Sequence, residues 1–177
     1  MRVAGKVVGA SIVMAAAQLQ TSPDSVHRRA ALISVLRLCE GCTSMIAKSA
    51  NELEKCVDFM MAGLQDASPW VQYQGLQGVG RFAVLFPSRI HNLLAKSLPV
   101  LITCLATAET GACQKVKGHA ASALINLLNP SNINCNDSSD PAFNTLTSNL
   151  NPLMSSLVHC LQTASLEVQS PCLVVLG

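Results

Sequence analysis

Aromatic residues are scarce in this chain. Four Phe, one Trp and one Tyr make up 3% of its 177 residues. A core without large rings has to be filled by Leu, Val, Ile, Ala and Met, and these are plentiful because half of the chain is hydrophobic. Aliphatic side chains of this kind suit closely packed helices, and no stretch shows a convincing strand pattern. The composition therefore favours an all-α protein.

Charged residues are also few. Charged residues make up 12% of the chain, about half of the ~25% that is usual in soluble domains. Twelve basic and ten acidic residues nearly balance, which leaves a net charge of +2. Proteins that bind nucleic acid normally carry a clustered basic surface, so we expect no nucleic-acid partner. No apolar run approaches the roughly 18–20 residues that a membrane span needs, so no membrane partner is expected either.

Patterns for catalysis or metal binding are missing as well. Cys39 and Cys42 form a C-x-x-C pair, but a structural zinc site normally needs a second pair of ligands at comparable spacing. The other six cysteines stand alone, and the four histidines have no mutual spacing that suggests a ligand set. There is no glycine-rich phosphate loop and no recognisable pair of nucleophile and base. We expect no enzyme activity, metal or cofactor, and thiol chemistry at Cys39 and Cys42 is the least favoured of the alternatives.

The chain does contain an internal repeat. An eight-residue phrase recurs as LQTSPDSV at 19–26, LQDASPWV at 64–71 and LQTASLEV at 161–168, with a weaker copy, CQKVKGHA, at 113–120. Its valines Val26, Val71 and Val116 are 45 residues apart, and Val168 follows after 52. A period of ~40–47 residues with two helices per unit is that of HEAT repeats.

Each phrase is expected to join two helices, which we name A before the phrase and B after it. Apolar residues at helical spacing predict A helices over 51–65, 90–105 and from about 150 to 161. A B helix is predicted from Trp70 to about Phe86, with Ser68 as its N-cap and Pro69 at its first position. The apolar positions of these A helices are Leu53, Cys56, Val57, Met60, Met61 and Leu64; Leu94, Leu98, Leu101, Ile102 and Leu105; and Leu150, Leu153, Met154, Leu157 and Leu161.

The predicted fold is an α-solenoid of about four HEAT repeats in one armadillo-like segment. The expected units are 1–45, 46–89, 90–147 and 148–177, the last of them incomplete because the chain stops within an apolar helix. The polar stretch 129–141 accounts for the longer last period, and a disordered surface connection is favoured there over a binding loop. The apolar stretch 7–17 is interpreted as the first A helix, with a secretory signal as the alternative.

Two further features concern the helices themselves. Pro99 and Pro152 lie at nearly the same distance before Val116 and Val168, which predicts a bend shared by the third and fourth A helices. Gly75, Gly78 and Gly80 in one B helix would each cost roughly 1 kcal/mol relative to alanine. We therefore expect either close packing at these glycines or a locally soft helix.

The B helices read VHRRAALISVLRLCEGC, VQYQGLQGVGRFAVLFP and VKGHAASALINLL. They resemble consecutive HEAT repeats of the importin-β (karyopherin-β) nuclear transport receptors, especially the importin beta-3-like branch. The segments that carry the resemblance are 39–42 (CEGC), 79–83 (VGRFA), 97–101 (SLPVL) and 119–126 (HAASALIN). The chain departs from the family at Trp70 and Gln72, where charge is common, and it has only about four of the many repeats.

The resemblance implies a segment of a nuclear import receptor that moves between cytoplasm and nucleus. Such receptors bind protein cargo on a concave surface lined by B helices, contact Phe-Gly nucleoporins on the A-helix side, and release cargo when Ran-GTP binds. A generic HEAT scaffold for assembling a protein complex is the alternative. Polar or aromatic B-helix residues are the candidate protein-binding positions: Trp70, Gln74, Arg81, Lys117, His119 and Asn126. Each of them could instead have a structural role, as when Trp70 packs over the turn.

Overall fold

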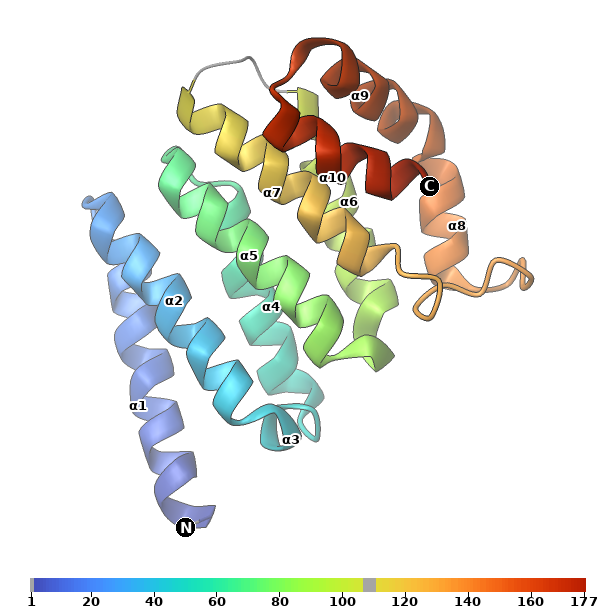
Figure 1. Cartoon of the computed structure of the whole chain (residues 1–177). Coiled ribbons are helices and arrows are strands. Elements are labelled where there is room, and N and C mark those ends of the chain that lie inside the picture. Colours follow the sequence, from blue (N-terminus) through green and yellow to red (C-terminus); the bar gives the residue numbers. More distant parts are fainter. Residues whose placement is uncertain (1, 107–110) are drawn as a thin grey trace. The chain divides into compact units, whose positions relative to one another are not determined.

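The computed structural model describes residues 2–106 and 111–177, apart from the side chains of residues 2–10, 111 and 112. All regular elements in this part of the chain are helices, as predicted (Figure 1). In chain order they are α1 (Arg2–Gln20), α2 (Ser25–Gly41), α3 (Thr43–Ile46), α4 (Ala50–Leu64), α5 (Pro69–Leu85), the 3₁₀ helix η1 (Pro87–Arg89), α6 (Ile90–Ala106), α7 (Gly111–Leu127), α8 (Pro141–Ser148), α9 (Leu150–Thr163) and α10 (Leu166–Leu176). They form two compact units, Met1–Gly78 and Val79–Gly177.

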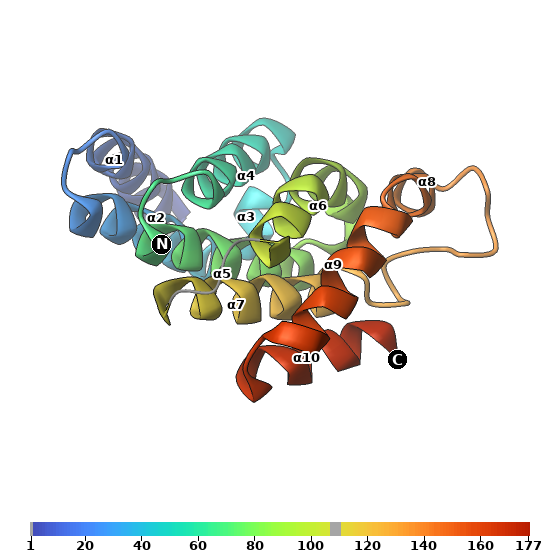
Figure 2. The same ribbon diagram turned by 90° about the horizontal axis from the view of Figure 1, so that it is seen from above.

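The first unit consists of helix pairs in two layers. Within it, α1 and α4 lie in one layer and α2 and the first half of α5 lie in the other (Figure 2). Helix α2 packs against both α1 and α4, and the short α3 connects α2 to α4. The repeated phrase lies where α1 turns into α2 and where α4 turns into α5, so it joins an A helix to a B helix as predicted.

Local sequence explains where these helices begin. The Asp24 carboxylate accepts a hydrogen bond of 2.8 Å from Val26 N and so caps α2. Helix α4 begins after Ser49, whose hydroxyl accepts from Glu52 N, in the Ser-x-x-Glu arrangement of a capping box. Helix α5 begins at Pro69, whose missing N–H would have had no partner in the first turn anyway.

Helices α4 and α5 approach each other unusually closely at Gly75. A Cβ atom placed there would lie 2.8 Å from Leu64 N and 2.9 Å from Gly63 C, which are both backbone atoms. A Cβ at Gly78 would overlap the Met60 side chain, which is fully buried. Close packing is therefore the reason for glycine at both positions, and their helical cost is offset by contact with α4.

The second unit begins within α5 and continues with α6 to α10. Helix α6 packs against α7, α8 and α9, and α10 packs against α7 and α9. In α6 four of the five predicted apolar positions are buried, and Ile102 is half-buried. In α4 only Met61 of the predicted set is not buried. Helical periodicity thus identified the packed faces of both helices.

The same prediction is only partly right for α9. Leu153 and Leu157 are buried, but Leu150 and Met154 are 45% and 40% exposed. They form an apolar stripe with Val158, which is 43% exposed, at a spacing of four residues. Apolar residues therefore occur on two faces of α9, and the described residues cover only one of them.

The prediction that Pro99 and Pro152 cause the same bend in the third and fourth A helices, α6 and α9, is wrong. Pro99 does lie inside α6, but α9 begins at Leu150, so Pro152 is its third residue. The N–H groups of the first turn have no partner within a helix, so proline there removes no hydrogen bond. The sequence analysis also did not anticipate α3, α8 and the interior Pro171 of α10.

The connection between α7 and α8 is irregular, as predicted, but it consists of hydrogen-bonded turns instead of a disordered segment. Asn129 and Asp137 each accept a bond from a backbone N–H two residues further on, at 2.9 Å in both cases. Asp140 accepts from Asn134 N at 2.8 Å and from Ala142 N at 2.7 Å, so it closes the loop and caps α8. Turn-forming side chains thus shape this loop.

We expect Gly75→Ala to lower the free energy of unfolding by about 1–3 kcal/mol, because the added methyl group meets the backbone of α4. Gly118→Ala in α7 is the matched control, since a Cβ there has no atom nearer than 3.8 Å. That control should gain up to about 1 kcal/mol from helix propensity. Urea unfolding followed by circular dichroism measures both, and equal effects would contradict the close approach.

Candidate protein-binding surface

An ion pair between Arg28 and Asp66 connects the turn after α1 to the turn after α4. Arg28 donates from Nε to Asp66 Oδ2 at 2.7 Å and from Nη2 to Asp66 Oδ1 at 2.9 Å. Its Nη1 donates to the carbonyl oxygens of Ser22 and Pro23 at 2.8 and 2.9 Å. Asp66 Oδ1 also accepts from Ser68 N at 2.8 Å. The turn after α1 is therefore bonded through one guanidinium to the turn after α4.

The electrostatics of this pair follow from its geometry. The hydrogen bonds from Arg28 hold the pKa of Asp66 below its ordinary value of 3.8, and the bond from Ser68 N acts in the same direction. The same contact raises the pKa of Arg28, which stays protonated. The two side chains are only 19% and 11% exposed, so solvent screens this pair less than an open surface pair.

Beside this joint lies a group of four side chains that we call the Arg29–Trp70 cluster, formed by Arg29, Trp70, Tyr73 and Gln77. The Arg29 guanidinium carbon lies over the Trp70 ring, 5.9 Å from its centroid. Trp70 meets Tyr73 edge to face at 6.4 Å, and Gln77 Nε2 donates to the Tyr73 hydroxyl at 3.1 Å. Arg29 comes from α2 and the other three come from successive turns of α5. Trp70 remains 46% exposed, so the cluster forms part of the surface.

The predicted site residues of the first unit, Trp70 and Gln74, lie one turn apart on α5 but differ in exposure. Trp70 is exposed, whereas Gln74 is only 5% exposed. A buried side chain does not reach a partner, so Gln74 is not part of a contact surface in this structure. Four residues advance a helix by only about 40° more than one turn, so the two positions point to nearly the same side. They differ in that Trp70 lies in the first turn of α5 and Gln74 lies one turn further along.

The four candidates of the second unit do not form one group. Arg81 on α5 is exposed, while Lys117 on α7 is 1% exposed and its Nζ has no hydrogen bond within the described residues. His119 is half-buried, with Nδ1 3.2 Å from the Lys115 carbonyl oxygen, and burial lowers its pKa. Lys117 is therefore a second candidate that the structure removes from the surface.

Asn126 has a packing role. It is half-buried, and a Cβ placed on Gly80 of α5 would lie 3.3 Å from its Nδ2. Its carbonyl oxygen accepts from Asn132 Nδ2 at 3.0 Å, which fixes the start of the loop after α7. Asn126 thus lies on the side of α7 that faces Gly80 of α5, and only part of its side chain is in solvent.

Sequence reasoning missed Arg29, Tyr73 and Gln77. The spacing of Trp70, Tyr73 and Gln77 at i, i+3 and i+7 could have shown that they share one face of a helix. Arg29 could not have been found in this way, because it is 41 residues from Trp70 in the sequence. Only the packing of α2 beside α5 brings the two together.

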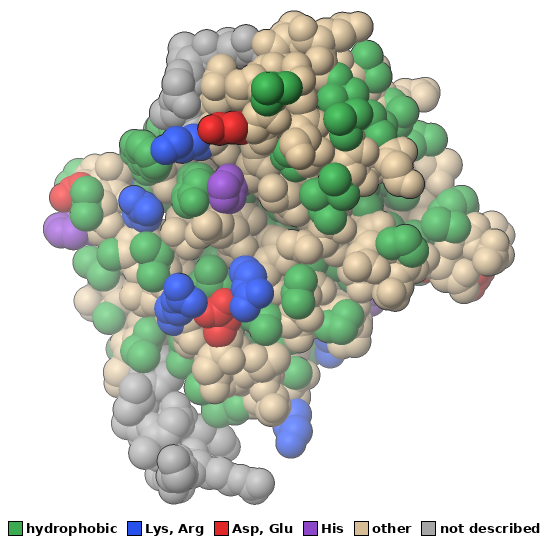
Figure 3. Space-filling model, viewed as in Figure 1, with side chains coloured by type: hydrophobic (Ala, Val, Ile, Leu, Met, Phe, Trp, Pro, Cys, Tyr) green, Lys and Arg blue, Asp and Glu red, His purple; other side chains and the backbone are tan. Residues whose placement is uncertain are grey.

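The surface around these residues has few charges. Figure 3 shows a small number of basic and acidic side chains, several of them side by side, among many hydrophobic and neutral polar ones. The Arg28–Asp66 ion pair joins α2 to the turn after α4, whereas Arg37–Glu40 and Lys55–Glu52 are pairs within one helix. Among the described residues no group of three or more His, Cys, Asp or Glu could hold a metal ion. None of the described helices has the length and hydrophobicity of a membrane span.

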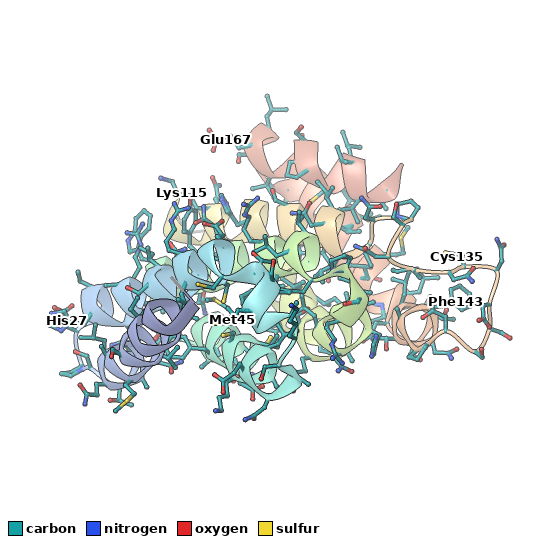
Figure 4. All side chains as sticks on the ribbon, turned by 90° about the horizontal axis from the view of Figure 1, so that it is seen from below. His27, Met45, Lys115, Cys135, Phe143 and Glu167 are labelled. Atoms are coloured by element: carbon teal, nitrogen blue, oxygen red, sulfur yellow. The ribbon has the colours of Figure 1, made fainter. Side chains whose placement is uncertain are left out.

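Most of the thiols are inaccessible. Cys39, Cys56, Cys104, Cys160 and Cys172 are buried, whereas Cys135 is exposed on the loop before α8 (Figure 4). Contact with Cys56 and burial raise the pKa of Cys39, and burial raises that of Cys104 to about 11. A buried thiol of raised pKa is a poor nucleophile, and Cys39 of the C-x-x-C pair is such a thiol.

Comparison with known proteins identifies the kind of solenoid. No protein-family model matches the chain. Importin subunit beta-3 of Saccharomyces cerevisiae is 27% identical over 157 residues, which are 88% of this chain and 14% of that protein. The crystal structure of Kap121p bound to RanGTP matches 97% of this chain with a TM-score of 0.79 at 26% identity. In sequence and in fold the chain is therefore similar to importin subunit beta-3 and to Kap121p.

Two further solved structures agree. Kap121p bound to Nup53p, and Kap121p bound to the extreme C-terminus of the protein phosphatase Cdc14p, each give a TM-score of 0.77 at 27% identity and 97% coverage. The chain spans about 15% of the length of those proteins. The α-solenoid predicted from the repeat period is confirmed by these neighbours. The names of these proteins are those of an importin and a karyopherin.

We expect acid to weaken the Arg28–Asp66 ion pair. Because the folded-state pKa of Asp66 is depressed, the pair stabilises the fold fully above the unfolded value of 3.8 and is lost as pH falls through the lower folded value. Asp66→Asn should lower the melting temperature by roughly 2–4 °C at neutral pH, and the difference from wild type should shrink below about pH 4.

Thermal unfolding followed by circular dichroism at a series of pH values measures this effect. Glu167→Gln, which alters an exposed carboxylate on α10, is the control and should leave the melting temperature nearly unchanged. A loss from Asp66→Asn that stays the same from neutral pH to pH 3 would contradict the assignment.

Proposed function

We propose that the chain is a protein-binding HEAT segment of a nuclear import receptor that carries protein cargo through the nuclear pore under the control of Ran-GTP. The observation that carries this proposal is the joint match in sequence and fold to Kap121p, at a TM-score of 0.79 and 26% identity over nearly the whole chain. A function in protein binding agrees with the exposure of Trp70 and Arg81 on α5.

The partners proposed for this chain follow from its neighbours. Kap121p has been crystallised with RanGTP, with Nup53p and with the C-terminus of Cdc14p. By analogy we propose protein cargo, Ran and Phe-Gly nucleoporins as partners, with the protein moving between cytoplasm and nucleus. The analogy applies to a segment, because the chain spans about 15% of Kap121p.

Among the candidate residues, Trp70 and Arg81 are proposed as contacts because both are exposed on α5. His119 and Asn126 are half-buried and are proposed to contribute their exposed edges. Exposed Trp and Arg are the residue types most enriched at binding hot spots.

Binding of the 177-residue chain to immobilised Ran-GTP, with Ran-GDP as the control, tests the proposal. Phe-Gly peptides, with Ser-Gly peptides as their control, form the second arm. A chain with this function should bind in at least one arm and ignore that arm's control. Binding in neither arm would instead favour the generic HEAT scaffold, which has no reason to distinguish the two nucleotide states of Ran or the two kinds of peptide.

A further inference from the structure

We propose that the Arg29–Trp70 cluster is a docking site for an acidic peptide segment, in which a carboxylate engages Arg29 and a neighbouring apolar side chain packs on Trp70. The inference deepens the proposed function, because it rests on the chain being a protein-binding solenoid and names the chemistry of one partner.

The first argument is the charge state of Arg29. Its neighbour Arg28 is bonded to both carboxylate oxygens of Asp66. The Asp24 carboxylate accepts from Val26 N. Within the described residues Arg29 itself has no ion pair, and its Nε is buried without a hydrogen-bond partner. Arg29 is thus a cation with no ion-pair partner among the described residues.

The second argument is that the guanidinium is already held in place. Arg29 lies over the Trp70 ring at 5.9 Å, and that ring is fixed at its edge by Tyr73, which accepts a bond from Gln77. A planar guanidinium offers paired N–H groups that match a carboxylate. Because the side chain is ordered before binding, a carboxylate ligand loses less of its binding free energy to ordering Arg29.

The third argument is the apolar neighbour. Trp70 is the only tryptophan in the chain and is 46% exposed. Half of a large ring in solvent, next to an uncompensated cation, favours a ligand that has a carboxylate and an apolar group side by side. A Lys-rich segment would place its charge against Arg29, and like charges at an interface are unfavourable.

An acidic peptide is favoured over a nucleic acid. The net charge of the chain is +2, and the cluster contains a single basic residue. A backbone of phosphates needs a track of several cations to gain affinity. One carboxylate needs only one guanidinium.

Fluorescence anisotropy of labelled peptides tests the proposal on the 177-residue chain. The probe is a short Gly/Ser peptide with one central Leu flanked by Asp, and the comparison peptides replace each Asp with Asn or Lys. We expect the Asp peptide to bind most tightly, the Lys peptide least tightly, and the binding of the Asp peptide to weaken as salt is raised. Emission of Trp70 should change only on binding of the Asp peptide.

Variants locate the site. Arg29→Gln should weaken the affinity for the Asp peptide by about fivefold or more. Arg29→Lys keeps the charge but not the planar guanidinium, so its affinity should lie between those of Arg29→Gln and wild type. Trp70→Leu should also weaken binding of the Asp peptide. This second variant tests the site even if Arg29→Gln does not fold normally. Arg89→Gln, at an exposed arginine on η1, is the matched control and should leave affinity unchanged.

Three results would overturn the inference. These are equal binding of the Asp and Lys peptides, an affinity unchanged by both Arg29→Gln and Trp70→Leu in folded protein, or tighter binding of an oligouridylate than of the Asp peptide. The outcome is independent of the proposed transport function. Retained Ran-GTP or Phe-Gly binding without peptide binding rejects only the acidic site, and the converse rejects only the transport function.

Discussion

Close packing between an A helix and its B helix is the constraint on which the first unit depends. With so few aromatic residues, the core gains contact area by bringing helix backbones together, and Gly75 is the point where α4 and α5 are nearest. Met60 fills the space beside Gly78, and Leu32 of α2 lies against Gly63 on α4. Because these contacts fix the rotation of α5 about its axis, they also decide which of its side chains face solvent. Trp70, in the first turn of α5, is exposed, and Gln74, one turn further along, is buried.

The turns add a second kind of connection. Arg28 bonds to two turns at once, and Asp66 accepts from both Arg28 and the backbone of its own turn. The Arg29–Trp70 cluster lies directly beside this joint, so its guanidinium and ring come from two helices whose ends are held together. A surface made by two helices in this way is more rigid than one made by a loop, which suits recognition of a short extended segment.

The sequence predicted the architecture better than the surface. The repeated phrase indicated where helices turn, and helical periodicity identified the buried faces of α4 and α6, because apolar spacing reports directly on packing. Helical periodicity was less successful for α9, because Leu150 and Met154 were expected to be buried and are exposed. Lys117 and Gln74 were placed at the surface because they are polar, yet both are buried, since side-chain polarity does not determine helix rotation. Arg29 was missed because its neighbour Trp70 is distant in sequence.

The distribution of the thiols has a practical consequence. Of the eight cysteines, five are buried in helix interfaces, Cys42 and Cys113 are half-buried, and Cys135 is exposed on the loop before α8. A thiol reagent added to the folded chain would therefore meet one open site first, and the others would become reactive as their helices separate. Cys39 and Cys56 report on the first unit, and Cys104, Cys160 and Cys172 report on the second. The chain thus has native markers that distinguish opening of one unit from opening of the other, without any added label.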